Sequence, residues 1–287
     1  MAATEIDDLA TALLGRVETS KRASGQPLSP PGTFLLVGLA QSLGAERVVW
    51  ETRTTGTEDG MVEVVDDRVL VSVRRTRGPS RARFTLAHEI GHLVLAQPDL
   101  KLVQMRRRSG LEDAERFCDA FAAALLMPRD WLEREYDRQP ESLDTLLACS
   151  GKTKTSLSAT LWRLRGTLSW STSLLHWRYS DGAWRMVGLT GVPYRLRREL
   201  STTGETQRLF EELPSGRSTA EIPLEGPVGA LKVQGETLVR RRSIIALVDL
   251  KDASRELWRR PVRRIAPPYG APRVVCPSWK YPDAKRS

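Results

Sequence analysis

Two histidines, His88 and His92, stand four residues apart in the segment FTLAHEIGH at residues 84–92. On an α-helix, positions i and i+4 lie one above the other on the same face, so both imidazoles point in one direction. Imidazoles placed in this way can supply two corners of a tetrahedral zinc site, and Glu89 projects beside them as a general base. Zinc lowers the pKa of a bound water toward about 7, which prepares it to attack a peptide carbonyl. The pattern therefore predicts a zinc-dependent protease rather than two histidines on a solvated helix face.

A zinc site of this kind needs a third protein ligand, which we expect from the next helix. That helix, predicted over residues 111–127, carries four acidic residues: Glu112, Asp113, Glu115 and Asp119. Glu115 and Asp119 are again four residues apart, so they share one helical face. One carboxylate can ligate the metal while the other accepts a hydrogen bond from the second nitrogen of a ligating imidazole. From spacing alone, a solvated stripe of these acids with Arg107 and Arg116 explains the pattern about equally well.

Both segments resemble the ImmA/IrrE metallo-endopeptidases. Residues 83–92 read RFTLAHEIGH, where the family has RFTLAHExGH. Residues 115–128 read ERFCDAFAAALLMP, where the family has E-x-x-A-(N/D)-x-F-A-x-x-L-L-M-P. The resemblance implies zinc ligands at His88, His92 and Glu115, a catalytic base at Glu89 and an outer-shell acid at Asp119. Cys118 stands where the family usually has alanine, and as a small, often buried residue it is expected to have a structural role.

The composition fits a folded protein without a membrane segment. Of the 287 residues, 40% are hydrophobic and 28% are charged, which is the balance of a soluble globular chain. The first residues, MAATEIDDLATALLGR, carry acids where a secretory signal needs basic residues, and no stretch reaches the roughly 18 apolar residues that cross a bilayer. Three scattered cysteines, Cys118, Cys149 and Cys276, do not suggest a disulfide framework. We therefore expect a cytoplasmic protein with no membrane partner.

The order of elements predicts an α+β fold. Valine-rich segments separated by turn residues indicate three strands, at residues 48–51, 60–65 and 68–73. Helices are indicated within residues 31–48, at 84–96 and at 111–127, the last closed by Pro128. The resemblance implies that residues 1–128 form a zincin-like helical metallopeptidase domain with a small sheet.

Residues 129–168 are predicted to be a helical extension of that domain. Segments 142–147 and 155–168 are separated by Ser150-Gly151-Lys152, and two helices joined by a short glycine turn have the outline of a helix-turn-helix. Any helical hairpin packed on a core has the same outline, so DNA reading by this unit is the less favoured interpretation.

From residue 169 the pattern changes to strands. Trp170, Trp177 and Trp184 recur every seven residues, which is more typical of the core of a β-rich domain than of a ligand cage. Asp181-Gly182 lies between two alternating segments and indicates a hairpin. Further strands are predicted at residues 230–233, 237–241 and 244–248.

Residues 169–287 are interpreted as a C-terminal regulatory or sensory-like domain. Some members of the resembling family carry an α/β domain similar to a GAF domain at this place, so a GAF-like fold is the expectation. His176 is expected to be a half-buried strand residue rather than a ligand. The tail from Arg259 is rich in Pro and Arg and is expected to be irregular or extended.

Charge is divided unevenly along the chain. Residues 1–150 hold 19 Lys and Arg against 23 Asp and Glu, a net of −4, whereas residues 151–287 hold 25 against 12, a net of +13. Such an excess can mark a surface that meets nucleic acid or an acidic protein. Arginine that merely solubilises the surface explains it equally well, because no aromatic-basic pattern for nucleic acid stands out. Nucleic acid is therefore an open but not favoured partner of the basic half.

The resemblance also implies a substrate class. Members of the family cleave a helix-turn-helix transcriptional repressor and thereby derepress stress-response or mobile-element genes, so such a repressor is the expected protein partner. Zinc is the expected metal, although two imidazoles and a carboxylate also accept Mn²⁺. Two rival interpretations stay open: a non-catalytic DNA-binding regulator with a structural metal site, and a toxin- or defence-type protease with another protein target.

Overall fold

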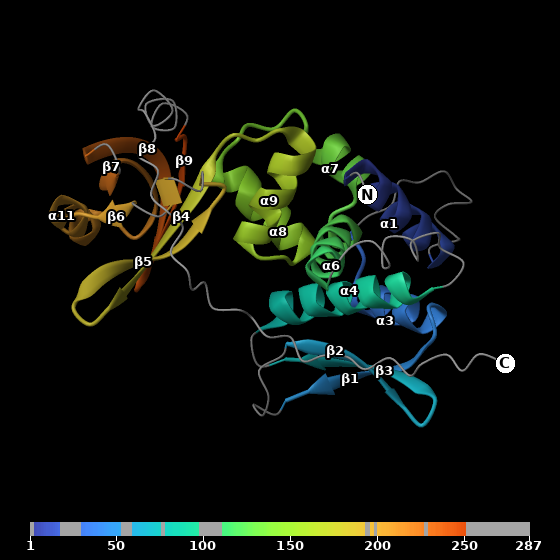
Figure 1. Ribbon diagram of the computed structural model, residues 1–287. Coiled ribbons are helices and arrows are strands. Elements are labelled where there is room, and N and C mark those ends of the chain that lie inside the picture. Colours follow the sequence, from blue (N-terminus) through green and yellow to red (C-terminus); the bar gives the residue numbers. More distant parts are fainter. Residues whose placement is uncertain are drawn as a thin grey trace, which may run out of the picture.

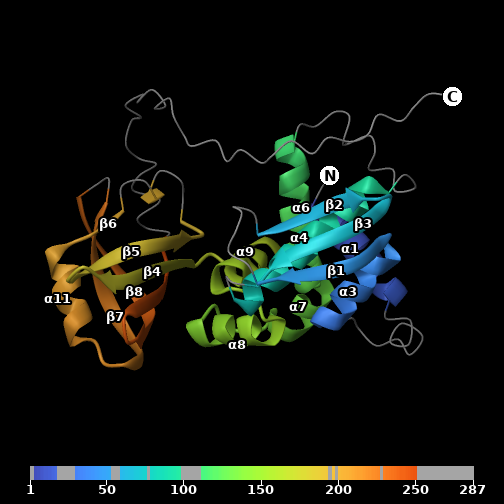
Figure 2. The same cartoon turned by 90° about the horizontal axis from the view of Figure 1, so that it is seen from below.

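The computed structural model describes residues 3–17, 30–52, 59–75, 78–97, 111–192, 196–197, 200–226 and 229–250. These residues form eight helices and two sheets, so the predicted α+β class is confirmed (Figure 1). Helices α8 (Leu143–Thr153) and α9 (Leu157–Leu168) lie between the two sheets in Figures 1 and 2. Each sheet has a hydrophobic core of its own.

The small sheet consists of β1 (Ala45–Glu51), β2 (Gly60–Val65) and β3 (Arg68–Arg74) in the order β1-β3-β2. β1 runs parallel to β3, whereas β2 runs antiparallel to it and forms an edge of the sheet. Successive side chains of a strand point to opposite faces, so Val71 and Val73 of β3 share the inner face, where both are fully buried. That face is covered by helix α4 (Pro79–Ala96).

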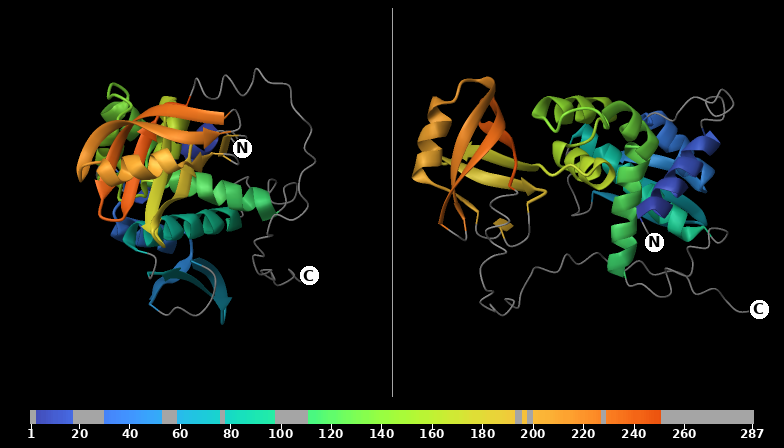
Figure 3. Two further views of the ribbon diagram at one scale, coloured as in Figure 1. Left: turned by 90° about the vertical axis from the view of Figure 1, so that its left-hand side faces the viewer. Right: turned by 90° about the horizontal axis from the view of Figure 1, so that it is seen from above.

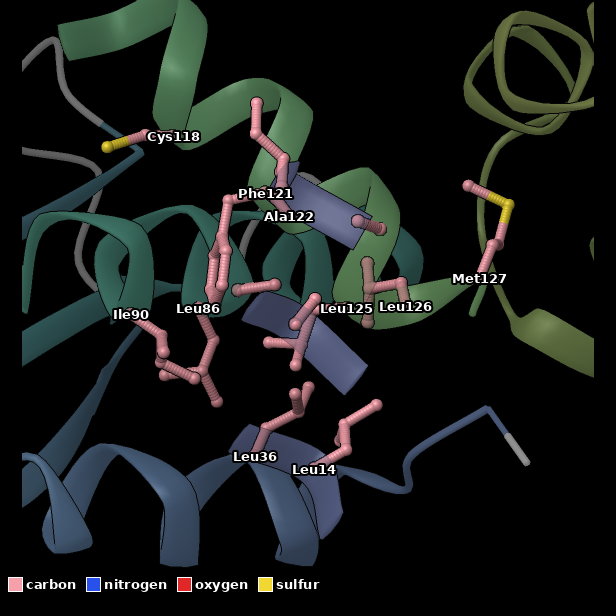
Figure 4. Packing of buried hydrophobic residues seen from close by; sticks show 14 of the residues in the cluster. Leu14, Leu36, Leu86, Ile90, Cys118, Phe121, Ala122, Leu125, Leu126 and Met127 are labelled. Atoms are coloured by element: carbon pink, nitrogen blue, oxygen red, sulfur yellow. The ribbon is translucent and has the colours of Figure 1, made fainter. Parts of the chain in front are cut away.

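The helical core above α4 follows from apolar residues that recur every three or four positions. Helices α1 (Ala3–Val17), α3 (Thr33–Ser42) and α6 (Leu111–Leu126) contribute to it together with α4. Figure 4 shows Leu86 and Ile90 of α4 in the same cluster as Phe121 of α6. Each such side chain stabilises the fold by about 1.5–3 kcal/mol through burial alone. The packing holds α4 and α6 in a fixed relation, on which the candidate site depends.

Helix α7 (Arg129–Tyr136) leads into the predicted helical hairpin of α8 and α9. The Ser142 hydroxyl accepts a hydrogen bond from the Thr145 amide at the start of α8, and Ser156 caps α9 in the same way. The buried Arg83 of α4 donates to the Thr153 carbonyl at 2.5 Å and to the Pro31 carbonyl at 2.6 Å. The hairpin is therefore attached to the helix that carries the histidines.

The larger sheet is antiparallel throughout, with the strand order β5-β4-β9-β8-β7-β6. Its strands are β4 (Ser173–Ser180), β5 (Ala183–Thr190), β6 (Ser201–Thr202), β7 (Gly216–Gly226), β8 (Gly229–Arg240) and β9 (Ser243–Val248). Asp181 and Gly182 both have positive φ between β4 and β5, so the predicted two-residue hairpin is confirmed. Helix α11 (Gly204–Glu212) covers the inner face, where Trp177 and Trp184 contact Phe210 edge to face.

Several predicted boundaries were wrong. The helix expected from residue 84 begins at Pro79, because proline is well suited to the first turn of a helix. Segments 230–233 and 237–241 are one strand, β8, which continues through Gly235. Helices α1 and α11 and strand β7 were not predicted. Trp170 is buried as expected, but it belongs to the helical core and not to that of the larger sheet.

The right-hand view of Figure 3 shows the larger sheet and α11 standing to one side of the helical part. No helix among the described residues is long and apolar enough to cross a membrane. Cys118 and Cys149 are buried free thiols. Cys276 and the tail from Arg259 lie outside the described residues.

Candidate metal centre

The candidate centre lies beside a close contact between α4 and α6. A Cβ atom at Gly91 of α4 would stand only 3.0 Å from the Cα atom of Cys118 in α6. Glycine at one position and a small residue at the other therefore permit the two backbones to come together. As a result, His88 and His92 of α4 face the acidic side chains of α6.

Three of the predicted site residues bring their donor atoms to one point. The Nε2 atoms of His88 and His92 are 3.2 Å apart. The Glu115 carboxylate lies 3.2 Å from the His88 Nε2 through one oxygen and 3.4 Å from the His92 Nε2 through the other. The two imidazoles and the carboxylate thus form a nearly equilateral triangle of donors.

The dimensions of this triangle fit a zinc ion. Zinc binds imidazole nitrogen and carboxylate oxygen at about 2.0–2.2 Å in tetrahedral geometry, which places neighbouring donors about 3.3 Å apart. The three separations of 3.2, 3.2 and 3.4 Å match that value. A set of three protein donors also leaves the fourth tetrahedral position for water or substrate, as catalytic zinc sites do.

Asp119 holds one of the two imidazoles in a defined orientation. The Nδ1–H group of His88 donates to the Asp119 carboxylate at 2.9 Å, which leaves the His88 Nε2 lone pair directed at the triangle. Burial lowers the pKa of His88, but the hydrogen bond to Asp119 and the negative charges of Glu89, Asp119 and Glu115 outweigh it, so that pKa is raised. This is the arrangement that outer-shell carboxylates give to metal-ligating histidines.

Glu89 is the most enclosed acid of the site, since only 6% of its surface is exposed. Gly60, the first residue of the edge strand β2, covers it. A Cβ atom at position 60 would stand 2.7 Å from the Glu89 Oε1 atom and would overlap the Thr85 methyl group. The absence of a side chain at Gly60 therefore lets β2 pass directly over the Glu89 carboxylate.

Comparison with known proteins agrees with this geometry. Residues 53–164, which contain both helices of the centre, match the Peptidase_M78 family, described as the IrrE N-terminal-like domain. The resemblance to ImmA/IrrE metallopeptidases is thereby confirmed for this part of the chain.

One similar protein is the radiation response metalloprotease IrrE of Deinococcus radiodurans. The two sequences are 31% identical over 113 residues, or 38% of this chain and 34% of the relative. The chain thus matches about a third of that relative's length. Among solved structures, a Mycobacterium tuberculosis transcriptional regulator aligns over 88% of this chain and 83% of its own, with 15% identity and a TM-score of 0.46.

Cys118, which was expected to have only a structural role, also lies beside the candidate metal centre. Its thiol is within 4.8 Å of the donor atoms of both histidines. Burial, followed by the charges of Glu115, Glu89 and Asp119, raises the pKa of this thiol. The Glu115 oxygens lie 3.2 and 3.4 Å from the two imidazoles, which is the separation expected between zinc ligands. Glu115 therefore completes the triangle, and the Cys118 side chain packs behind it against Gly91.

Sequence reasoning missed two glycines of the site, Gly60 and Gly91. Gly91 was visible as part of the histidine motif, but its contact is with a helix about thirty positions further along. Gly60 was read only as the first residue of a strand. Both glycines matter because a Cβ atom at either position would collide with a neighbouring element, and the sequence does not show which element that is.

Proposed function

We propose that this protein is a zinc-dependent endopeptidase. The observation that carries the proposal is the donor triangle of His88, His92 and Glu115, with the buried Glu89 beside it. The match of residues 53–164 to a metallopeptidase family supports the same activity. A purely structural zinc site would not need the enclosed glutamate.

In this proposal, His88, His92 and Glu115 hold the metal and Asp119 fixes the His88 ring. Zinc supplies Lewis acidity, which lowers the pKa of water toward about 7 and polarises a peptide carbonyl. Glu89 accepts the proton of the attacking water and delivers it to the leaving amine. Burial beneath β2 shields the Glu89 carboxylate from bulk solvent, which strengthens its interactions with a substrate.

Strand β2 is the proposed binding edge for the substrate. Among the described residues it pairs only with β3, so its other side is open to a further strand. An extended peptide could add to this edge through main-chain hydrogen bonds. Because Gly60 lies over Glu89, a peptide aligned with the start of β2 brings a peptide bond to the catalytic group.

The proposed substrate is a helix-turn-helix transcriptional repressor, whose cleavage derepresses stress-response or mobile-element genes. The resemblance of the two helix motifs supports this class, and the matched relative is named a radiation response metalloprotease. An interdomain linker of a repressor has the extended backbone that strand addition requires. Zinc is proposed over manganese because a triangle of two nitrogens and one carboxylate suits a four-coordinate ion.

We propose three units: a metallopeptidase domain (1–128), its helical extension (129–168) and a regulatory domain (169–287). We also propose that the protein acts in the cytoplasm. The separate core beneath the larger sheet supports the third unit. Its antiparallel sheet, with α11 on the inner face, is compatible with a GAF-like sensory role.

The test uses the full-length protein loaded with one equivalent of zinc and a panel of helix-turn-helix repressors from the same genome. We expect one discrete cut in one repressor, located by intact mass, and no cut by Glu89→Gln at unchanged zinc content. Cleavage of an unrelated protein alone would overturn the substrate class. Failure of the zinc-loaded protein to cleave any protein, or equal cleavage by Glu89→Gln, would overturn the endopeptidase itself.

A further inference from the structure

The larger sheet carries arginines side by side across its strands. Arg178 of β4 lies directly opposite Arg185 of β5, and on its other side it pairs with Ser243 of β9. Ser243 in turn pairs with Arg240 of β8. The hairpin that joins β8 to β9 adds two more arginines. We call this set the arginine row: Arg185, Arg178, Arg240, Arg241 and Arg242.

The arginine row lies on the outer face of the sheet. Trp177 and Ile244 are fully buried in the core under α11, and side chains alternate along a strand. Arg178 and Ser243 therefore point to the opposite face, on which Leu174 and Leu247 pack against the helical core further along the same strands. All five arginines of the row are exposed.

Negative charge near the row is scarce. Asp181 lies 3.6 Å from Arg185, and both side chains are largely exposed, so this pair contributes little. On the adjacent β7, Arg217 is paired with Asp144 of α8. Within the described part of the chain, Arg178, Arg240, Arg241 and Arg242 have no carboxylate partner. Like charges directly opposite each other, such as Arg178 and Arg185, destabilise a sheet. We therefore expect the row to bind an anionic partner rather than to stabilise the fold.

The dimensions of the row suit an extended anion. From β5 to β8 it crosses three strand spacings, about 14 Å. A duplex nucleic acid presents about eight phosphate charges along that length of its axis. Guanidinium groups bind phosphate oxygens in pairs, and a line of them matches a backbone better than a single phosphate, which needs donors that converge.

The neighbouring positions favour a duplex over a single strand. The next row on the same face consists of Arg217, Leu238, Ile245, His176 and Gly188. Neither row contains a Trp, Tyr or Phe on which unpaired bases would stack, and the ring of His176 is held by a hydrogen bond of 2.8 Å between its Nε2 atom and the Ser243 hydroxyl. We infer that the arginine row is a binding surface for the phosphate backbone of duplex nucleic acid, independent of sequence.

The test measures binding of the full-length protein, in EDTA, to a fluorescein-labelled 20-base-pair DNA duplex by anisotropy between 50 and 300 mM salt. EDTA removes the metal, so the binding measured here does not depend on the proposed protease activity. Five phosphate contacts predict a slope of log K against log salt of about −4.5. Arg178→Ala with Arg240→Ala should make the slope shallower by about 2 and weaken binding equally for duplexes of different sequence.

The matched control is Arg16→Ala with Arg47→Ala, which removes the same charge from exposed positions on α1 and β1. The control should bind like the wild type, and all variants should show the same thermal unfolding midpoint to within a few degrees. Equal weakening by both double variants, or no salt-dependent binding at 50 mM salt, would overturn the inference. Competition by polyglutamate as effective as by unlabelled duplex would reassign the row to an acidic protein, and tighter binding of single-stranded DNA would exclude the duplex.

Discussion

The molecule contains two clusters of like charge that differ in almost every physical respect. At the metal centre, Glu89, Glu115 and Asp119 surround two imidazoles in a partly buried crossing of helices, with donors 3.2 to 3.4 Å apart. In the arginine row, five exposed cations are spread along a line across an open sheet. Convergent donors in a small space match a small cation, whereas a line of exposed cations matches an extended anion.

The two clusters also differ in how they are compensated inside the protein. The acids of the centre already interact with histidines, and they raise the pKa of His88 in return. Most of the arginine row has no carboxylate partner in the described part of the chain. The negative charge of the metal centre is therefore balanced by groups within the protein. The positive charge of the arginine row is balanced only by ions or by a partner in solution.

The largest effect is expected from Glu89→Gln. This substitution keeps the shape of the buried side chain and removes its ability to accept a proton, so peptide cleavage should fall by about 10²–10⁴-fold. Zinc content, measured by mass spectrometry of the metal, should stay at the wild-type level. A loss of zinc in this variant would instead place Glu89 among the ligands.

Glu115→Ala should weaken zinc binding by more than about 100-fold, because a ligand matters more than the outer-shell groups that cost 10–100-fold. Competition with a fluorescent chelator measures this affinity. Cys118→Ala is the matched control: it shortens a side chain of the same helix and restores the residue usual in the family. If the Cys118 variant lost zinc and the Glu115 variant kept it, the donor triangle would have to be redrawn with the thiol.

Gly60→Ala should lower both stability and activity. The added methyl group overlaps Thr85 and stands 2.7 Å from the Glu89 carboxylate, so overpacking should cost about 1–3 kcal/mol in the free energy of unfolding. Urea unfolding and cleavage assays measure the two effects. Gly166→Ala is the control, since nothing lies within 4 Å of its Cβ position in α9 and alanine there should stabilise the helix by about 0.5–1 kcal/mol.

The smallest effect is expected in the arginine row. Arg178→Thr removes a cation that faces Arg185 directly and places a good strand former in β4. The free energy of unfolding at low salt should rise by about 0.2–1 kcal/mol, and the gain should shrink at high salt because screening weakens the original repulsion. A loss of stability on this substitution would show that the row is compensated after all, and the contrast with the metal centre would fail.

Much of the metal centre could be predicted from the sequence because its information is local. The spacing of His88 and His92, and of Glu115 and Asp119, specifies which side chains share a helical face, and helical geometry is the same in every protein. The three strands of the small sheet were predicted for a similar reason, since valine content and turn residues act within a few positions. Elements without such a signal were missed, as α11 and β7 were.

The choice between a solvated acidic stripe and a metal site at Glu115 and Asp119 was open from spacing alone. It depended on whether α6 would approach α4, and that approach requires the contact of Gly91 with Cys118. Likewise the basic excess of residues 151–287 was visible in the sequence, but its arrangement was not. Strand register brings Arg178, Arg185 and Arg240 together: Arg178 pairs with Arg185, and both Arg178 and Arg240 pair with Ser243 of β9.

The sequence by itself therefore determined which side chains share a face of one helix or one strand, and with them the donor types of the candidate metal centre. Only the tertiary structure decided which faces meet: α6 against α4 to complete the donor triangle, Gly60 above Glu89, and the arginines of β4, β5 and β8 in one row. The physical reason is that backbone geometry is set by neighbouring residues, whereas the meeting of distant surfaces is set by packing over the whole core.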